Sequence, residues 1–172
     1  GAGHGLLEQI RSAFSLQKAA HVPLPVDYAE RFGTAEDVEG VRKHGLASRD
    51  DVEVPRIAII GVTPEKGYGF YQRLLPHVAK VWPEAQFDIY GGGGYVEGLA
   101  GLPNATCHGH TPVGDIFSNC DIHLLTVRST GSWGRVINEA GLFGIPSVSV
   151  NIGAQPEAVG EGGVIVAADA DL

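Results

Sequence analysis

Short apolar runs alternate with amphipathic segments through the second half of the chain. Continuous apolar runs of about four to eight residues are typical of strands that are buried on both faces of a parallel sheet. Such runs predict strands over 56–61, 86–90, 105–108, 121–127, 147–150 and 163–167. Because short turns and helical segments separate these runs, the pattern predicts an α/β fold, a doubly wound parallel sheet of about six strands.

Helical periodicity predicts helices over 70–82, 96–100, 111–119 and 135–143, and a helical turn over 156–159. Pro76 is expected to kink the first helix or to mark its start. The residues of that helix predicted to face the core are Leu74, Leu75, Val78 and Val81. In segment 135–143 the predicted buried face comprises Val136, Ile137, Ala140 and Phe143, and the opposite side Arg135, Asn138, Glu139 and Leu142.

Residues 1–55 lack this regular alternation. They predict a helix over 6–18, a proline-interrupted linker, and a short polar helix that starts near Thr34 with capping-box-like spacing to Asp37. We therefore interpret 1–55 as a helical segment and linker region that leads into a domain over 56–172. The chain has no methionine and stops just after an apolar strand, so we expect a fragment of a longer polypeptide.

Candidate chemistry gathers in the loops that follow the predicted strands. Ligands of doubly wound sheets bind at the carboxyl ends of the strands. The loops at those ends contain Lys66, the glycines 91–94, His110, a glycine and serine turn over 130–134, and Gln155 with Glu157.

The glycine and serine turn lies directly before the predicted helix 135–143. The first N–H groups of a helix have no partner within it and carry partial positive charge, and glycines let a ligand approach them, so this turn suits a phosphate. Glu139 lies one turn further on, where a carboxylate can accept two hydrogen bonds from a ribose diol. The alternative is that Glu139 is a solvated carboxylate paired with Arg135, and the local residues leave both interpretations open.

Composition narrows the class of protein. With 172 residues and 18.1 kDa the chain has the size of one ordinary domain. The net charge of −8 argues against a general nucleic-acid-binding protein, whose footprint is a basic patch. Cys107 and Cys120 lie in apolar segments and need no disulfide, which favours a reducing, cytoplasmic location. No apolar run approaches the roughly 20 residues that span a bilayer.

Five stretches match a known family in their order and spacing. They read IAIIGVTPEKGY, FDIYGGGG, HGHTPVGDIFSNCDIHLLT, GSWGRVINEAGLFGIPSV and AQPEAVGEGGVIV. Together they resemble the carboxy-terminal domain of the group 1 glycosyltransferases, one Rossmann-like half of a GT-B fold. The resemblance covers residues 22–172, and NEAGLFGIPSV and PEAVGEGG are its most specific parts.

The resemblance implies a domain that holds a nucleoside diphosphate sugar, whereas a missing amino-terminal domain holds most of the acceptor site. It implies that Glu139 binds the ribose, that Lys66 neutralises the diphosphate, and that the backbone near His110 and Thr111 contacts the base. The turn expected to face the diphosphate comprises Ser132, Trp133, Gly134, Arg135 and Val136.

The implied reaction moves a sugar to a hydroxyl of a glycan, a lipid or a small molecule, typically with retention of the anomeric configuration. Neither a metal nor another cofactor is expected, because the His108 and His110 pair lacks a third ligand at readable spacing. Nucleic acid is not an expected partner. Any peripheral contact with the cytosolic face of a membrane is expected through the missing half.

Two positions depart from the family pattern. Val62 stands where an arginine is usual, with one residue fewer before Lys66, and Gly131 replaces the first of two glutamates. A lost arginine removes a charge-assisted contact of about 1.5–3 kcal/mol, for which Arg128 or Arg135 is a candidate replacement. These departures keep two alternatives open: a non-catalytic homologue that acts as scaffold or partner subunit, and a GT-B sugar-nucleotide epimerase.

Overall fold

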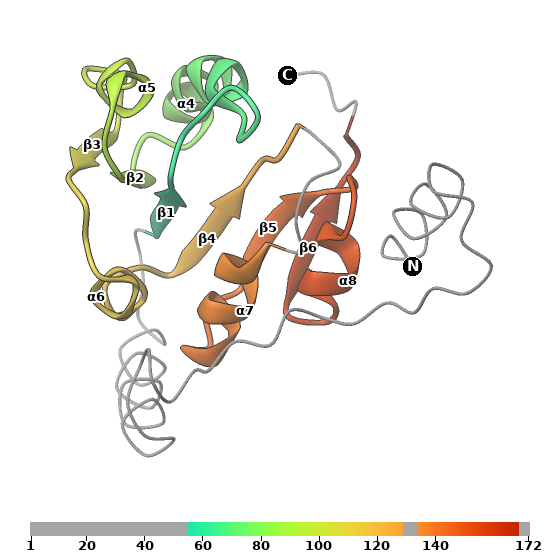
Figure 1. Ribbon diagram of the computed structural model, residues 1–172. Helices are drawn as coiled ribbons and strands as arrows, with labels where there is room; N and C mark the ends of the chain where they lie inside the picture. Colours follow the sequence, from blue (N-terminus) through green and yellow to red (C-terminus); the bar gives the residue numbers. More distant parts are fainter. Residues whose placement is uncertain (1–54, 129–133, 169–172) are drawn as a thin grey trace, which may run out of the picture.

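The computed structural model describes residues 55–128 and 134–168 (Figure 1). The helices expected over 6–18 and from Thr34 onward, the linker, and the residues Gly131, Ser132 and Trp133 lie outside the described residues.

The described residues form a six-stranded sheet in the order β3-β2-β1-β4-β5-β6 (Figure 1). Every neighbouring pair of strands is parallel. The strands are β1 (Arg56–Ile60), β2 (Gln86–Tyr90), β3 (Ala105–His108), β4 (Ile122–Leu125), β5 (Ser147–Val150) and β6 (Gly163–Val166). The predicted doubly wound α/β fold is therefore confirmed, and five of the six strands differ from their predicted bounds by at most one residue at either end.

Helices cover both faces of the sheet, as burial of its apolar strands requires. They are α4 (Tyr68–Val81), α5 (Gly94–Glu97), α6 (Val113–Ser118), α7 (Arg135–Leu142) and α8 (Gln155–Val159). On one face, Tyr71 and Leu75 of α4 pack with Phe87 of β2 in a core that also includes Val96 of α5. On the other face, α6 and α7 pack over β1, and α8 packs with β5 and β6.

Helix α4 departs from its predicted pattern in two ways. It starts at Tyr68 and runs through Pro76, so this proline does not mark the start of the helix. The N–H that Pro76 lacks would have bonded the carbonyl of Gln72, which is an exposed residue open to water. Val81, predicted to face the core, is 69% exposed, because it lies at the last residue of the helix, beyond the part that packs on the sheet.

Smaller differences lie at the ends of two other elements. Strand β4 ends at Leu125 rather than at Val127, so two further residues belong to the loop that follows it. Pro112, expected at the first helical position, instead precedes α6 with an extended backbone, φ −55° and ψ 137°. Such shifts at element ends are common because local propensity changes little over one or two residues.

Candidate functional site

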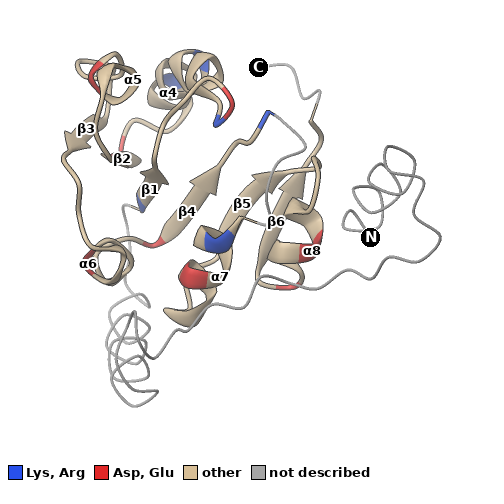
Figure 2. Ribbon diagram, viewed as in Figure 1, with Lys and Arg blue, Asp and Glu red and all other residues tan. Residues whose placement is uncertain are grey.

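The sheet order brings two of the candidate loops together. β1 is flanked by β2 and β4, so the winding direction of the chain reverses between β1 and β4, the position at which such sheets bind their ligands. The backbone N–H of Arg128, after β4, donates to the carbonyl of Glu65, after β1, at 2.7 Å. Basic residues accordingly lie both at the turn before α4 and just beyond β4 (Figure 2).

Lys66 belongs to a tight turn at the carboxyl end of β1. Its N–H donates to the carbonyl and to the hydroxyl of Thr63, at 3.0 and 3.2 Å. Its ammonium folds back over the strand end: a Cβ placed on Gly61 would lie 3.1 Å from Lys66 Nζ. The turn, which lies in the predicted loop after the first strand, therefore holds the Lys66 ammonium above the end of β1.

The loops after β2 and β3 are joined by their backbones. The N–H of Gly91, the first residue of the glycine run, donates to the carbonyl of Gly109 at 3.3 Å. The Thr111 hydroxyl donates to the same carbonyl at 3.2 Å, and His110 is exposed beside it. The two residues expected to contact a base therefore lie next to the glycine run.

Gly134 directly precedes helix α7, and its backbone is left-handed with φ 76° and ψ 55°. The carbonyl of Gly134 accepts the N–H of Ile137 at 2.8 Å, which closes the first turn. Arg135 is exposed and Val136 is half-buried. Of the five residues that the family resemblance assigns to the diphosphate, the structure therefore describes Gly134, Arg135 and Val136.

The position of Glu139 differs from the prediction, which placed this residue opposite the buried face of α7. Its side chain is only 1% exposed, so the interpretation as a solvated carboxylate is wrong. A short helix with neighbours on two sides buries a wider arc than one apolar stripe, because α7 contacts α8 as well as the sheet. A buried carboxylate is costly unless polar groups or a ligand meet it, which makes Glu139 a stronger candidate for a functional group than the sequence indicated.

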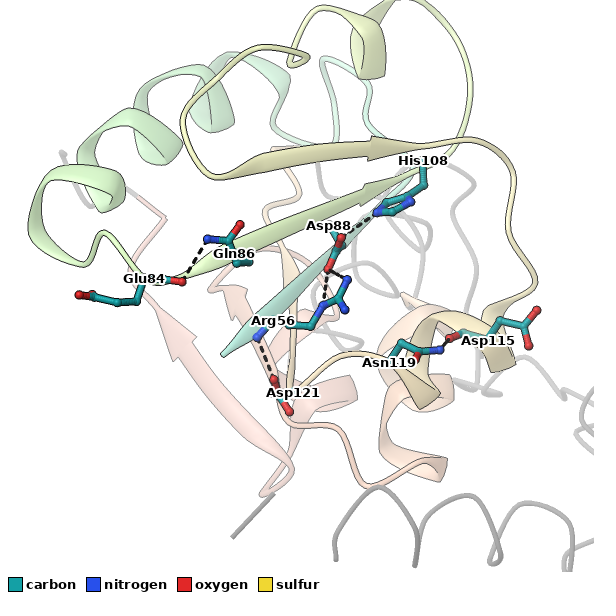
Figure 3. A network of polar contacts seen from close by, with 8 residues as sticks. All are labelled: Arg56, Glu84, Gln86, Asp88, His108, Asp115, Asn119 and Asp121. Atoms are coloured by element: carbon teal, nitrogen blue, oxygen red, sulfur yellow. Dashed lines mark hydrogen bonds and ion pairs between the residues drawn. The ribbon is translucent and has the colours of Figure 1, made fainter. Parts of the chain in front are cut away.

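A second buried carboxylate was not singled out by the sequence. Asp88 of β2 is 3% exposed and joins three adjacent strands (Figure 3). Its Oδ2 accepts from Nε and Nη2 of Arg56 at 2.9 and 2.8 Å, and this contact is the main cause that raises the pKa of Arg56. The strand sequence QFDIY carried a signal, since its polar residues alternate with apolar ones and share one face.

His123 of β4 is a buried residue of a different kind. Its ring is fully buried, lies edge-on to Phe117 at 5.7 Å, and has Nδ1 3.0 Å from the hydroxyl of Ser147. Burial lowers its pKa from 6.5 to about 4, so the imidazole is neutral at pH 7. His123 lies inside the sheet rather than at its carboxyl edge, and its role is structural.

The two departures from the family pattern have different outcomes. Val62 is 4% exposed and belongs to the core beneath α4. Gly131 lies outside the described residues. Of the candidate replacement cations, Arg128 is exposed, and its Nη1 donates to the carbonyl of Ala168 at 2.9 Å, across the carboxyl edge of the sheet.

Two negative findings apply to residues 55–128 and 134–168. In these ranges no three His, Cys, Asp or Glu side chains are grouped so that they could hold a metal ion. None of the helices there is long and apolar enough to cross a membrane.

Comparison with known proteins gives a family match that spans the whole of the described region. The model of the family described as "Glycosyl transferases group 1" matches residues 54–172. A GDP-mannose-dependent alpha-(1-6)-phosphatidylinositol monomannoside mannosyltransferase of Mycolicibacterium smegmatis is 28% identical over 176 residues. That alignment covers 88% of this chain but 43% of the relative, so the chain spans less than half of the relative's length.

Solved structures share the fold. WaaG, a glycosyltransferase involved in lipopolysaccharide biosynthesis, superimposes with a TM-score of 0.65 and 11% identity, over 96% of this chain and 48% of its own. HepE of Anabaena, in complex with UDP and glucose, gives a TM-score of 0.56 and 21% identity, over 79% of this chain and 40% of its own. At these identities the likeness supports the fold alone.

Proposed function

This chain belongs to the group 1 glycosyltransferases, and on that premise we propose that it is the donor-binding part of an enzyme that transfers a sugar from a nucleoside diphosphate sugar to a hydroxyl group. The acceptor is a glycan, a lipid or a small molecule. Most of the acceptor-binding site lies on a separate amino-terminal domain. The transfer retains the anomeric configuration. The mannosyltransferase relative is named as GDP-mannose-dependent and the HepE structure holds UDP, so GDP and UDP are the first nucleotides to test.

The main support for this proposal is the burial of the Glu139 carboxylate. Glu139 lies one turn after the amino end of α7, and α7 follows β4 at the switch point of the sheet. In the proposed complex Glu139 binds the ribose hydroxyls. Lys66 and the first amides of α7 meet the diphosphate, and the backbone at His110 and Thr111 meets the base.

The proposed chemistry is electrostatic. Negative charge builds on the diphosphate as its bond to the sugar breaks, and a fixed cation and fixed N–H dipoles stabilise that charge more than they stabilise the ground state. Neither a metal nor another cofactor is required by this scheme. No general base is assigned, because the acceptor lies on the other domain.

Binding of UDP, GDP and ADP to the chain, measured by isothermal titration calorimetry, tests the proposal. One of the three is expected to bind, and Glu139→Ala is expected to weaken that binding by more than about tenfold, since it removes charge-assisted hydrogen bonds to the ribose. Glu161→Gln is the matched control, because Glu161 is an exposed glutamate in the loop between α8 and β6. Failure of all three nucleotides to bind at millimolar concentration contradicts the proposal.

A non-catalytic homologue is the second candidate, and the burial of Val62 favours it. A side chain 4% exposed in the core offers no cation at the position where the family usually has an arginine. Under this alternative the chain binds a nucleotide or a partner subunit without transfer. Turnover of any nucleotide sugar by the whole protein excludes it.

A further inference from the structure

Gln155, the first residue of α8, lies against the start of α7. Its side chain is 1% exposed although it is a polar residue at a helix end. A Cβ placed on Gly134 would lie 3.0 Å from Gln155 Oε1 and 3.2 Å from Nε2. The flat carboxamide therefore packs against the α-carbon of the glycine that directly precedes α7.

Gly134 is the residue whose backbone decides where the first amides of α7 point. Its left-handed conformation, φ 76°, is one that residues with side chains rarely adopt. A side chain at this position would also meet Ile137 Cδ1 at 3.2 Å. The turn is thus held between the first turn of its own helix and the carboxamide of Gln155.

A buried serine connects Gln155 to the sheet. The hydroxyl oxygen of Ser149 on β5 lies 3.4 Å from Gln155 Oε1 and 2.8 Å from the carbonyl oxygen of Leu125 on β4. Ser149 is itself 1% exposed. A buried series of contacts therefore runs from the end of β4, through Ser149 and Gln155, to the α-carbon of Gly134.

Resting on the proposed function, we propose that Gln155 is a positioning residue: it sets the Gly134 turn so that the first amides of α7 face the diphosphate of the donor. Gln155 does not touch the ligand in this scheme. An apolar side chain of similar size would fill the same space at a lower cost of desolvation, but it would lack the polar contact with Ser149 that orients the carboxamide against Gly134. Ser149 acts on the diphosphate through Gln155.

The chain offers a close control for this proposal. Ser147 and Ser149 are two residues apart on β5, face the same side of the sheet and are equally buried. Ser147, however, contacts His123 at 3.0 Å, away from the carboxyl edge. Ser149→Ala and Ser147→Ala therefore remove similar buried hydroxyls, of which only the first supports Gln155.

The experiment measures dissociation constants of the nucleoside diphosphate that binds best and of its monophosphate, for the wild type, Gln155→Leu, Ser149→Ala and Ser147→Ala. Loss of folded protein weakens both ligands equally, so the ratio of the two constants reports contacts to the diphosphate alone. Gln155→Leu is expected to weaken the diphosphate by about fivefold more than the monophosphate, the effect of one hydrogen bond. Ser149→Ala shifts the ratio in the same direction, and Ser147→Ala leaves it unchanged.

An unchanged ratio in Gln155→Leu overturns the positioning role while leaving the proposed function intact. If Gln155→Leu does not fold, Ser149→Ala provides the test. An unchanged ratio of the two dissociation constants in Ser149→Ala, or an equal shift of that ratio in Ser147→Ala, overturns the inference. If the wild type binds neither the diphosphate nor the monophosphate, that result contradicts the proposed function, and the positioning role, which rests on it, is overturned as well.

Discussion

Oδ1 of Asp88 lies 2.7 Å from Nε2 of His108, and so joins the middle of β2 to the last residue of β3 (Figure 3). The other carboxylate oxygen binds the guanidinium of Arg56 on β1. The His108 ring is also stacked on Tyr90 at 4.7 Å and 15°. One buried carboxylate therefore fixes the half of the sheet whose carboxyl edge carries His110 and Thr111.

Asp88→Asn tests this relationship. We expect a loss of unfolding free energy of about 1–3 kcal/mol, because the amide cannot accept from both Arg56 and His108 as the charged carboxylate does. Urea denaturation measures the change. Glu84→Gln, an exposed acid that points away from this network (Figure 3), is the control and is expected to change stability little. Equal stability of Asp88→Asn and wild type would show that the network is energetically neutral.

The buried imidazole of His123 predicts a pH dependence of stability. Its pKa is about 4 in the folded chain, against 6.5 for an accessible histidine, so the unfolded state binds the proton more tightly. This contribution is complete above pH 6.5 and is lost as the pH falls from 6.5 towards 4, amounting to about 2 kcal/mol between pH 7 and pH 5.

The measurement compares the wild type with His123→Asn by urea denaturation at pH 7 and pH 5. Asparagine retains a polar partner for Ser147 but does not titrate in this range. The variant is expected to lose less stability than the wild type on acidification, since all other titrating groups are shared. A loss of the same size in both proteins refutes the assignment.

Two glycines at the start of α4 are expected to respond in opposite directions to alanine. A Cβ on Gly67 would lie 2.5 Å from the carbonyl oxygen of Thr126 and closer still to its hydroxyl oxygen, on a backbone with φ 84°. Gly67→Ala should therefore cost more than about 2 kcal/mol, through strain and collision. Nothing lies within 4 Å of a Cβ on Gly69, so Gly69→Ala should stabilise by about 0.5 kcal/mol.

Thermal unfolding of the two variants measures this contrast. A destabilised Gly69→Ala, or a Gly67→Ala as stable as wild type, would mean that the turn before α4 is not packed against Thr126 in solution.

Under the proposed function, Lys66→Gln weakens diphosphate binding by about tenfold, because the ammonium at the end of β1 no longer meets the anion. The difference between wild type and variant should shrink as salt is added, since screening reduces what an exposed charge contributes. Calorimetry at low and high salt measures both effects. Lys80→Gln, an exposed lysine in the last turn of α4, is the control, and an equal loss in both variants contradicts the specific role of Lys66.

Much of the fold could be predicted from the sequence because strands buried on both faces are locally apolar. The strands at 86–90, 105–108 and 147–150 have the predicted bounds, and Gly134 and Gly144 bracket α7 as the turn pattern indicates. The position of the candidate loops at one edge of the sheet was also predictable, because the carboxyl ends of parallel strands share one edge. Which of the residues in those loops bind a nucleotide stays a prediction.

What only the tertiary structure decided is the environment of the polar residues. Four polar residues that the sequence does not distinguish from ordinary exposed ones are buried: Asp88, His123, Glu139 and Gln155. Val81 reads as apolar and is exposed. Periodicity records which residues share a face, but burial depends on which elements, distant in sequence, pack against that face. The order of the strands determines which elements pack together. It also places the turn that contains Lys66, after β1, beside the loop after β4.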